Sequence, residues 1–235
     1  MINNPAISKE ESIDKNGLLL LIDKPKDYSS ARVVNIIKKK LNVRKAGHSG
    51  TLDPKASGLL IVCTDRQTKK LSNLLESDKE YEGIMILGEI TKSFDAEMKV
   101  IEKKPIDNIN REKILETAKF FRGEVEQLPP MFSAVKYKGK PLYKYAREDK
   151  DVLRKTRKVF IKEFEIKGIL KPEVHFRIVC SKGTYIRTLV NDFGRKLGVG
   201  AYLKELRRLK IGTYDVKDSI KLEEISAEAG VDESI

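Results

Sequence analysis

One short stretch near the N-terminus gathers residue types that could do chemistry. Residues 47–58 run Gly-His-Ser-Gly-Thr-Leu-Asp-Pro-Lys-Ala-Ser-Gly, with one of the chain's two histidines close to a carboxylate. Glycine permits backbone conformations closed to other residues, and Pro54 fixes its own φ and disfavours helix at Asp53. The composition therefore predicts a shaped loop. A carboxylate on such a loop could act as a nucleophile or as a base.

The loop alone does not decide the role of Asp53. Asp-Pro is a common start of a turn and Asp is a common helix cap, so a structural role stays open. A phosphate-binding P-loop is excluded, because no Gly-Lys-Ser/Thr closes the segment and no helical pattern starts directly behind it. The apolar run Leu59–Val62 that follows predicts a buried strand. A rigid loop beside a core strand is a usual place for functional side chains.

The residues before the loop predict a strand and a helix that lead into it. Leu18–Ile22 predicts the strand, and Ser29 or Ser30 can cap the helix. Four aliphatic residues then recur at helical spacing: Val33, Val34, Ile37 and Leu41. Lysines 38–40 face elsewhere on this helix, so they place positive charge beside the loop.

The rest of the chain alternates strands and helices in mixed order. We expect helices at 65–75, from 107 or 110 to 121, and at 184–197, and strands at 79–91, 97–101, 156–169 and 173–180. Pro129 and Pro130 exclude residues 128–134 from a central strand. This order predicts an α+β fold with a largely antiparallel mixed sheet flanked by helices. We expect a loose arm at 1–16, one domain at 17–222 and a short acidic tail at 223–235.

The charge balance points to a polyanionic partner. The 235 residues include 47 Lys and Arg against 35 Asp and Glu, a net charge of +12. Such a balance favours nucleic acid first and an anionic membrane second, with a merely soluble basic protein as the alternative. Residues 136–147 mix three tyrosines with Lys and Arg, which suits RNA because bases stack on rings while cations meet phosphates. A solvated helix face whose tyrosines pack inward fits the same segment.

Cysteine and histidine usage indicates a reducing compartment and no metal. Cys63 and Cys180 lie far apart, each at the end of an apolar run, which predicts buried reduced thiols. Two histidines without clustered cysteines argue against a zinc site. The early apolar run at 18–22 is too short to span a membrane, and no signal peptide precedes it. We therefore expect a soluble cytoplasmic protein.

Several segments together resemble one family, the TruB-type tRNA pseudouridine-55 synthases. The loop at 47–54 resembles the family's catalytic motif, which more often has Thr where this chain has Ser49. Further resembling segments follow in the family's order between about residues 18 and 222: Lys24-Pro25 with Ser29-Ser30, Lys79-Glu80-Tyr81, 129–134 with 139–143, 180–188 and 206–208. Several motifs in order are more specific than one loop, so the resemblance implies that Asp53 is the catalytic carboxylate.

The implied reaction is an isomerisation of uridine 55 in the T-loop of tRNA to pseudouridine. The N-glycosidic bond breaks, the base turns, and a bond forms to C5. Nothing is oxidised and no group is imported, so no cofactor is expected. Flipping the base out of the RNA costs a few kcal/mol, and stacking on an aromatic ring returns roughly 1–3 kcal/mol. The resemblance makes Tyr81 that ring.

The resemblance also assigns the neighbours of Asp53. Arg187 is the expected partner that keeps the carboxylate ionised against burial. Asp53 then acts either as a nucleophile at the sugar or as the base that starts cleavage. Tyr185 is expected to contact the flipped base or to assist late removal of the proton from C5, and a core tyrosine is the alternative.

Three further residues complete the implied site. His48 is expected to fill the space that the base leaves, with bracing of the loop as the alternative. Leu206 would form an apolar wall of the base pocket, and Lys24 would support the loop. Outside the pocket, the basic runs at 38–40, 136–144 and 207–210 are expected to contact phosphates, although such runs are often only solvated surface.

One departure from the family concerns the C-terminus. Many members continue into a small RNA-binding module of the PUA type, and we expect none in a chain that ends at Ile235. We expect a monomer that binds the T-arm of tRNA without a guide RNA. Two alternatives stay open: an RNA-binding or RNA-folding protein in which catalysis is secondary or lost, and a relative directed to uridines by a separate RNA.

Overall fold

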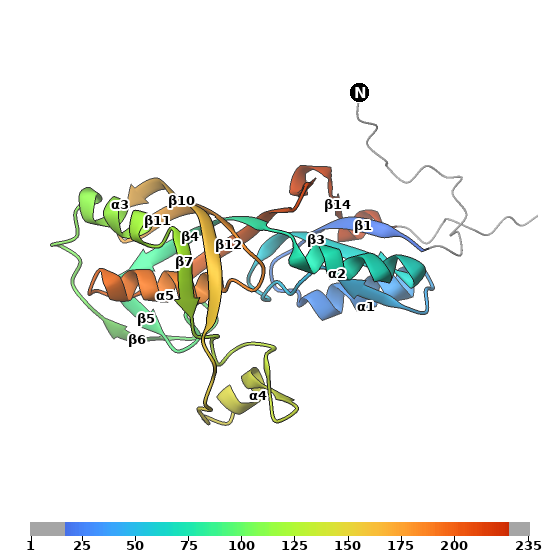
Figure 1. The fold of residues 1–235 in the computed structure, drawn as a ribbon, viewed down its shortest axis with the longest axis horizontal. Helices are drawn as coiled ribbons and strands as arrows, with labels where there is room; N and C mark the ends of the chain where they lie inside the picture. The colour runs from blue at the N-terminus through green and yellow to red at the C-terminus, as the bar shows by residue number, and fades with distance from the viewer. Residues whose placement is uncertain (1–16, 226–235) are drawn as a thin grey trace, which may run out of the picture. The chain divides into compact units, whose positions relative to one another are not determined.

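The computed structural model describes residues 17–225 (Figure 1). The chain forms two compact units. The predicted arm at 1–16 and most of the predicted tail at 223–235 lie outside the described residues. Unit 1 comprises Met1–Lys79 with Arg207–Ile235, and unit 2 is the continuous segment Glu80–Leu206. The domain boundaries that we expected at residues 17 and 222 stay a prediction.

Unit 1 is built on short strands flanked by helices. Its elements are β1 (Leu19–Lys24), α1 (Ser30–Lys40), β2 (Ala46–His48), β3 (Ser57–Thr64), η1 (Asp65–Lys70), α2 (Leu71–Glu76), the end of β12 (Ala201–Ile211), β13 (Tyr214–Asp215), η2 (Val216–Asp218), β14 (Ile220–Lys221) and η3 (Leu222–Glu224). Strand β3 pairs antiparallel with β1 and β2 and parallel with the end of β12, while β14 pairs parallel with β1. The loop of interest therefore connects two strands that pair with each other.

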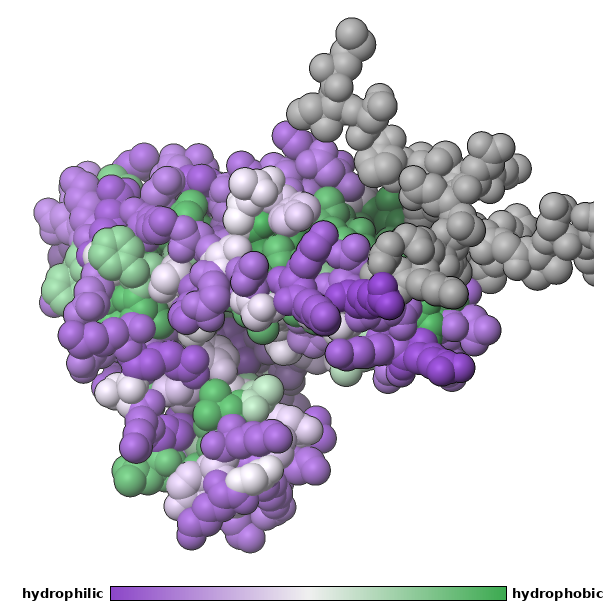
Figure 2. Space-filling view, turned by 45° about the vertical axis from the view of Figure 1, so that its right-hand side comes forward, coloured by the Kyte–Doolittle hydropathy of each residue, from purple (hydrophilic) through white to green (hydrophobic). Residues whose placement is uncertain are grey.

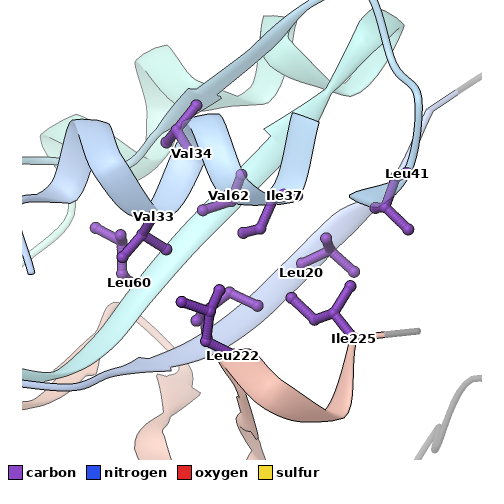
Figure 3. Packing of buried hydrophobic residues seen from close by; sticks show 10 residues of the cluster. Leu20, Val33, Val34, Ile37, Leu41, Leu60, Val62, Leu222 and Ile225 are labelled. Carbon is purple, nitrogen blue, oxygen red and sulfur yellow. The ribbon is translucent and has the colours of Figure 1, made fainter. Parts of the chain in front are cut away.

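Strand β3 is buried along its whole length because both of its faces are covered. Leu60 and Val62 face α1, where Val33 and Ile37 lie against them (Figure 3). The alternate residues of β3 belong to a second buried cluster with Leu74 of α2. Burial on both faces explains why this strand appears in the sequence as a continuous apolar run. The predicted helix cap is confirmed, since the Ser29 side chain accepts a hydrogen bond from the backbone of Arg32.

The first residues of β3 require a glycine. Gly58 has φ +97°, and a Cβ at this position would lie 2.3 Å from the carbonyl oxygen of Arg208 on β12. We expect Gly58→Ala to lower the free energy of unfolding by roughly 3 kcal/mol or more, because it adds a clash to an unfavourable φ. Gly123→Ala is the matched control, since Gly123 has φ +93° and nothing lies within 4 Å of its Cβ position. Urea denaturation of both variants measures the difference, and equal losses would contradict a role for close packing.

Unit 2 is a larger sheet with two longer helices. Its elements are β4 (Lys79–Leu87), β5 (Glu89–Thr91), β6 (Val100–Lys103), α3 (Arg111–Phe120), β7 (Gly123–Gln127), β8 (Lys136–Tyr137), β9 (Lys140–Pro141), α4 (Leu142–Ala146), β10 (Arg157–Leu170), β11 (Glu173–Cys180), α5 (Ile186–Lys196) and the first part of β12. The main strand order is β12-β4-β11-β10-β7. Helix α5 carries Phe193 into an aromatic cluster with Phe121 and Phe164.

Three predicted elements differ from the structure. The strand expected at 79–91 is two strands, β4 and β5, because Gly88 at φ +78° turns the chain and its carbonyl accepts from the backbone of Lys104. Strand β6 is the antiparallel partner expected near 97–101, but it begins at Val100 and forms a two-stranded sheet with β5. The helix expected at 65–75 is a 3-10 helix followed by a short α-helix.

The basic segment 136–147 forms a small hairpin followed by α4. Its tyrosines are half-buried, so they neither pack fully inward nor stand free in solvent. Tyr137 and Tyr145 meet edge to face at 5.9 Å, and Lys140 Nζ lies 4.7 Å from the centre of the Tyr145 ring. Hydrophilic residues cover most of the face of the molecule shown in Figure 2. Cys63 and Cys180 are both buried and do not form a disulfide, as predicted.

Candidate active site

The loop between β2 and β3 is fixed through its backbone. The Ser30 hydroxyl at the start of α1 donates to the carbonyl of Leu52 at 3.0 Å and accepts from its N–H at 2.9 Å. The N–H of Asp27 donates to the carbonyl of Pro54 at 2.8 Å. These bonds hold the residues on both sides of Asp53, whose own side chain is half-buried. The prediction of a shaped loop is therefore confirmed.

Lys24 lies beneath this loop and is fully buried. Its Nζ donates to the carbonyls of Pro25 at 2.9 Å, Tyr28 at 2.6 Å and Pro54 at 3.3 Å. Burial lowers the pKa of Lys24 to about 8, and the nearby Asp53 carboxylate opposes this shift. At neutral pH the side chain is therefore an ammonium that ties the loop to the chain after β1.

The lowered pKa of Lys24 predicts a pH dependence of stability. Between about pH 8 and the ordinary value of 10.5, the unfolded chain binds more protons at Lys24 than the folded chain. The free energy of unfolding of the wild type should therefore rise with pH in this window relative to Lys24→Met, which has no such proton. Urea unfolding of both proteins across the window measures this gap. Lys26→Met, at an exposed neighbour, is the control. A gap between wild type and Lys24→Met that stays constant with pH would contradict the prediction.

Arg208 supports the loop from the side of β12. Its side chain is 1% exposed, and its guanidinium donates from Nε to the carbonyl of Leu59 at 2.7 Å and from Nη2 to that of Gly50 at 3.1 Å. The preceding Arg207 forms a two-pronged ion pair with Asp23 at 2.7 and 3.0 Å. We expected the basic run at 207–210 to contact phosphates. For Arg208 this prediction is wrong, because its charge is buried under the loop.

His48 also contributes to the shape of the loop. It lies at the end of β2, and its Nδ1 accepts a hydrogen bond from the N–H of Gly50 at 3.2 Å. Burial, and then the charge of Arg208, lower the pKa of His48 below its ordinary value. A neutral imidazole that braces the loop agrees with one of the two roles weighed from the sequence.

Arg187 is held in unit 2 by three oxygens. It is the second residue of α5, is 4% exposed, and donates from Nη1 to the carbonyl of Ser93 at 3.2 Å and from Nη2 to that of Phe132 at 2.8 Å. Its Nε lies 3.4 Å from Oδ2 of Asp95. The guanidinium is therefore fixed in one orientation by the chain around it.

Sequence reasoning missed Asp95. This carboxylate is 5% exposed, and its Oδ1 accepts hydrogen bonds from the Ser93 hydroxyl and from the N–H of Glu97. The preceding Phe94 has φ +64°, which is rare for a bulky residue and is found where a site imposes a strained backbone. A phenylalanine in a left-handed conformation cannot be recognised from the sequence, so no local signal marked this position.

Tyr185 is the N-cap residue of α5 and its backbone is bracketed by a buried glutamine. Its N–H donates to Oε1 of Gln127 at 3.0 Å, and its carbonyl accepts from Nε2 of the same side chain at 3.2 Å. The Arg157 guanidinium lies over its ring, 4.8 Å from the centre. Tyr185 is half-buried, so its ring is neither a core ring nor a free surface group.

The remaining predicted site residues also belong to unit 2. Tyr81 lies on β4 and is 8% exposed, and Leu206 lies on β12 and is 7% exposed. Asp53, Lys24 and His48 thus come from unit 1, and Tyr81, Tyr185, Arg187 and Leu206 come from unit 2. The expected pairing of Asp53 with Arg187 joins residues of different units and stays a prediction.

Matches to protein-family models extend over both units. Residues 38–186 match the model of the TruB family pseudouridylate synthase N-terminal domain. The chain belongs to the TruB family of pseudouridylate synthases. Residues 187–234 match a second TruB model, described as the tRNA pseudouridylate synthase B C-terminal domain. The first TruB match contains Asp53, Tyr81 and Tyr185, and the second begins at Arg187.

Individual TruB relatives match most of the chain. The tRNA pseudouridine synthase B of Flavobacterium johnsoniae is 47% identical over 213 residues, which are 88% of this chain and 93% of that protein. The protein of the same name from Endomicrobium trichonymphae is 47% identical over 206 residues, covering 88% and 90% of the two chains. This TruB-family chain is therefore similar in length as well as in sequence to these relatives.

Two solved structures resemble this chain in fold. One is a Cbf5-Nop10-Gar1 complex, at 33% identity and a TM-score of 0.71, with 95% of this chain covering 57% of that one. Another is an H/ACA RNP bound to a substrate RNA containing 2'-deoxyuridine, at 31% identity and a TM-score of 0.66, with 89% of this chain covering 52% of that one. The chain spans little more than half the length of these two. The predicted α+β class is confirmed.

Residues 17–225 contain neither a candidate membrane span nor a candidate metal site. No helix in this range is long and apolar enough to cross a membrane. No group of three or more His, Cys, Asp or Glu side chains in this range could hold a metal ion.

Proposed function

We propose that this TruB-family chain converts uridine 55 in the T-loop of tRNA to pseudouridine. The observation that carries the proposal is the 47% identity to a tRNA pseudouridine synthase B over 93% of that protein's length. The net charge of +12 suits a tRNA substrate. In this proposal the enzyme is a cytoplasmic monomer that binds the T-arm and needs no guide RNA.

Asp53 is the reacting carboxylate of the proposed site. The backbone bonds of Leu52 and Pro54 support this role, because a loop that is already fixed needs little reorganisation when the uridine enters. As a nucleophile it would attack the sugar, and as a base it would start cleavage of the N-glycosidic bond. Either role needs the ionised form. Arg187 is proposed to keep Asp53 ionised, since a fixed guanidinium favours a carboxylate.

The flipped base is proposed to lie among three side chains of unit 2. Tyr81 stacks on the uracil ring, Tyr185 contacts the base or assists removal of the C5 proton, and Leu206 forms an apolar wall. From unit 1, His48, which braces the loop through its Nδ1, is also proposed to occupy the space that the base leaves in the RNA, and Lys24 holds the loop. Isomerisation moves no electrons to an outside acceptor, so the proposed chemistry requires no redox cofactor.

Release of tritium from C5-labelled uridine tests the proposal. Pseudouridine formation replaces the C5 hydrogen by the C5–sugar bond, so each turnover on a labelled tRNA transcript releases tritium to water. We expect release from an unmodified transcript and none above background from a transcript with cytidine at position 55. Equal release from both transcripts would contradict the assignment of the site, and release from neither would contradict the reaction.

A further inference from the structure

Two residues of the paired strands β7 and β10 hold Tyr185, one through its backbone and the other through its ring. Gln127 at the end of β7 makes two hydrogen bonds to the Tyr185 backbone. Arg157 lies directly opposite Gln127 in the β7–β10 pairing and covers the Tyr185 ring. These two contacts fix where the tyrosine stands and how its ring is turned.

Arg157 has no other partner among residues 17–225. Apart from its contact with the Tyr185 ring, its guanidinium makes no hydrogen bond and no ion pair within this part of the chain. The side chain is only half-buried. The neighbouring Lys158 differs, because its Nζ lies 2.8 Å from a carboxylate oxygen of Glu124. The charge of Arg157 is therefore uncompensated within these residues, although its contact with the Tyr185 ring holds the guanidinium in place.

Gly183 leaves room beside this guanidinium. It has φ +73°, and a Cβ at this position would lie 3.2 Å from Nη1 of Arg157. The glycine thus serves the turn before α5 and also keeps one edge of the guanidinium uncrowded. A planar cation with one face on a ring and its N–H groups at the edge is the geometry that binds an anionic oxygen pair.

We propose that Arg157 binds a backbone phosphate of the RNA substrate beside Tyr185. This inference rests on the proposed function, which makes the anion an RNA phosphodiester. The stack on Tyr185 orients the guanidinium, and the phosphate accepts two of its N–H groups. In this way Arg157 would position the nucleotide whose base contacts Tyr185. Arg157 was not part of the basic runs that the sequence led us to expect at the phosphates.

Salt-dependent binding of a T-arm hairpin gives the first test. Arg157→Gln should weaken binding roughly tenfold and reduce the slope of log affinity against log salt by about 0.7, the loss of one phosphate contact. Lys158→Gln is the matched control, since it removes the same charge from the same strand, at a side chain 66% exposed and paired with Glu124. Its slope should equal that of the wild type. Arg157→Lys keeps the charge and should keep most of the slope.

A scan with single methylphosphonate linkages identifies the phosphate. Each neutral linkage removes one phosphate charge from the hairpin. We expect one position that weakens binding of the wild type and leaves binding of Arg157→Gln unchanged. If every linkage weakens both proteins equally and the salt slope of Arg157→Gln equals that of the wild type, Arg157 only packs on Tyr185 and the proposal is wrong. Binding is read independently of turnover, so failure here differs from failure of the tritium assay.

Discussion

Asp53→Asn is expected to abolish tritium release from the tRNA transcript while leaving the chain folded. The amide has the same shape, and the loop is held by backbone bonds of Leu52 and Pro54 that the substitution does not touch. An amide can neither attack the sugar nor accept a proton, so the single-turnover rate should fall on the order of 10³-fold or more. Binding of the T-arm hairpin measured in parallel should change little.

Asp27→Asn is the control for a lost carboxylate in unit 1. The Asp27 side chain is exposed and forms its ion pair with Lys55 in solvent, so the rate of this variant should stay near that of the wild type. The comparison also separates an enzyme from an RNA-binding protein with secondary catalysis. If Asp53→Asn still makes pseudouridine at the wild-type rate, the assignment of the catalytic carboxylate is wrong.

Arg187→Met is expected to reduce both stability and rate. Removing this buried guanidinium leaves the Asp95 carboxylate without its cationic partner and two carbonyls without their Arg187 donor. Breaking one side of a buried ion pair typically costs ~3–5 kcal/mol, so the urea midpoint should fall clearly. The proposed pairing with Asp53 adds a loss of rate, roughly a hundredfold or more, because the carboxylate loses its stabilising charge.

Two companion variants separate these effects. Arg187→Met combined with Asp95→Asn removes the orphaned charge, so stability should recover in part while the rate stays low. Arg187→Lys keeps the charge without the planar fork, so its rate should fall more than its stability. A rate near that of the wild type in Arg187→Met would contradict the pairing with Asp53, whatever happens to stability.

Local sequence patterns were sufficient to predict most of the helices and strands. Strand β11 at Glu173–Cys180 has the predicted bounds, because its residues alternate between buried and half-buried positions. Helix α1 begins after the predicted cap at Ser29. The division of the strand at 79–91 was not predicted. A glycine at position 88 does not reveal in the sequence that its backbone bonds to Lys104 and Gly200.

The candidate site was predictable only where it is local in sequence. The glycines and the proline of the loop around Asp53 marked it in the sequence, although Ser30, Lys24 and Arg208, which hold it, come from elsewhere in the chain. The partners of Arg187 within unit 2 come from two distant segments, at 93–95 and at Phe132, so Asp95 could not be inferred. The burial of Arg208 was equally hidden, because a basic run looks the same in sequence whether its side chains point to solvent or under a loop.

The interrupted order of unit 1 bears on how the protein matures as it leaves the ribosome. Unit 2 is one continuous segment, whereas β3 gains its β12 partner only after residue 207, and Leu222 and Ile225 close the cluster around α1. Until the last few dozen residues emerge, the edge of β3 and the apolar face of α1 lack their final cover. Nascent chains stalled in this interval are therefore the ones that need protection from aggregation.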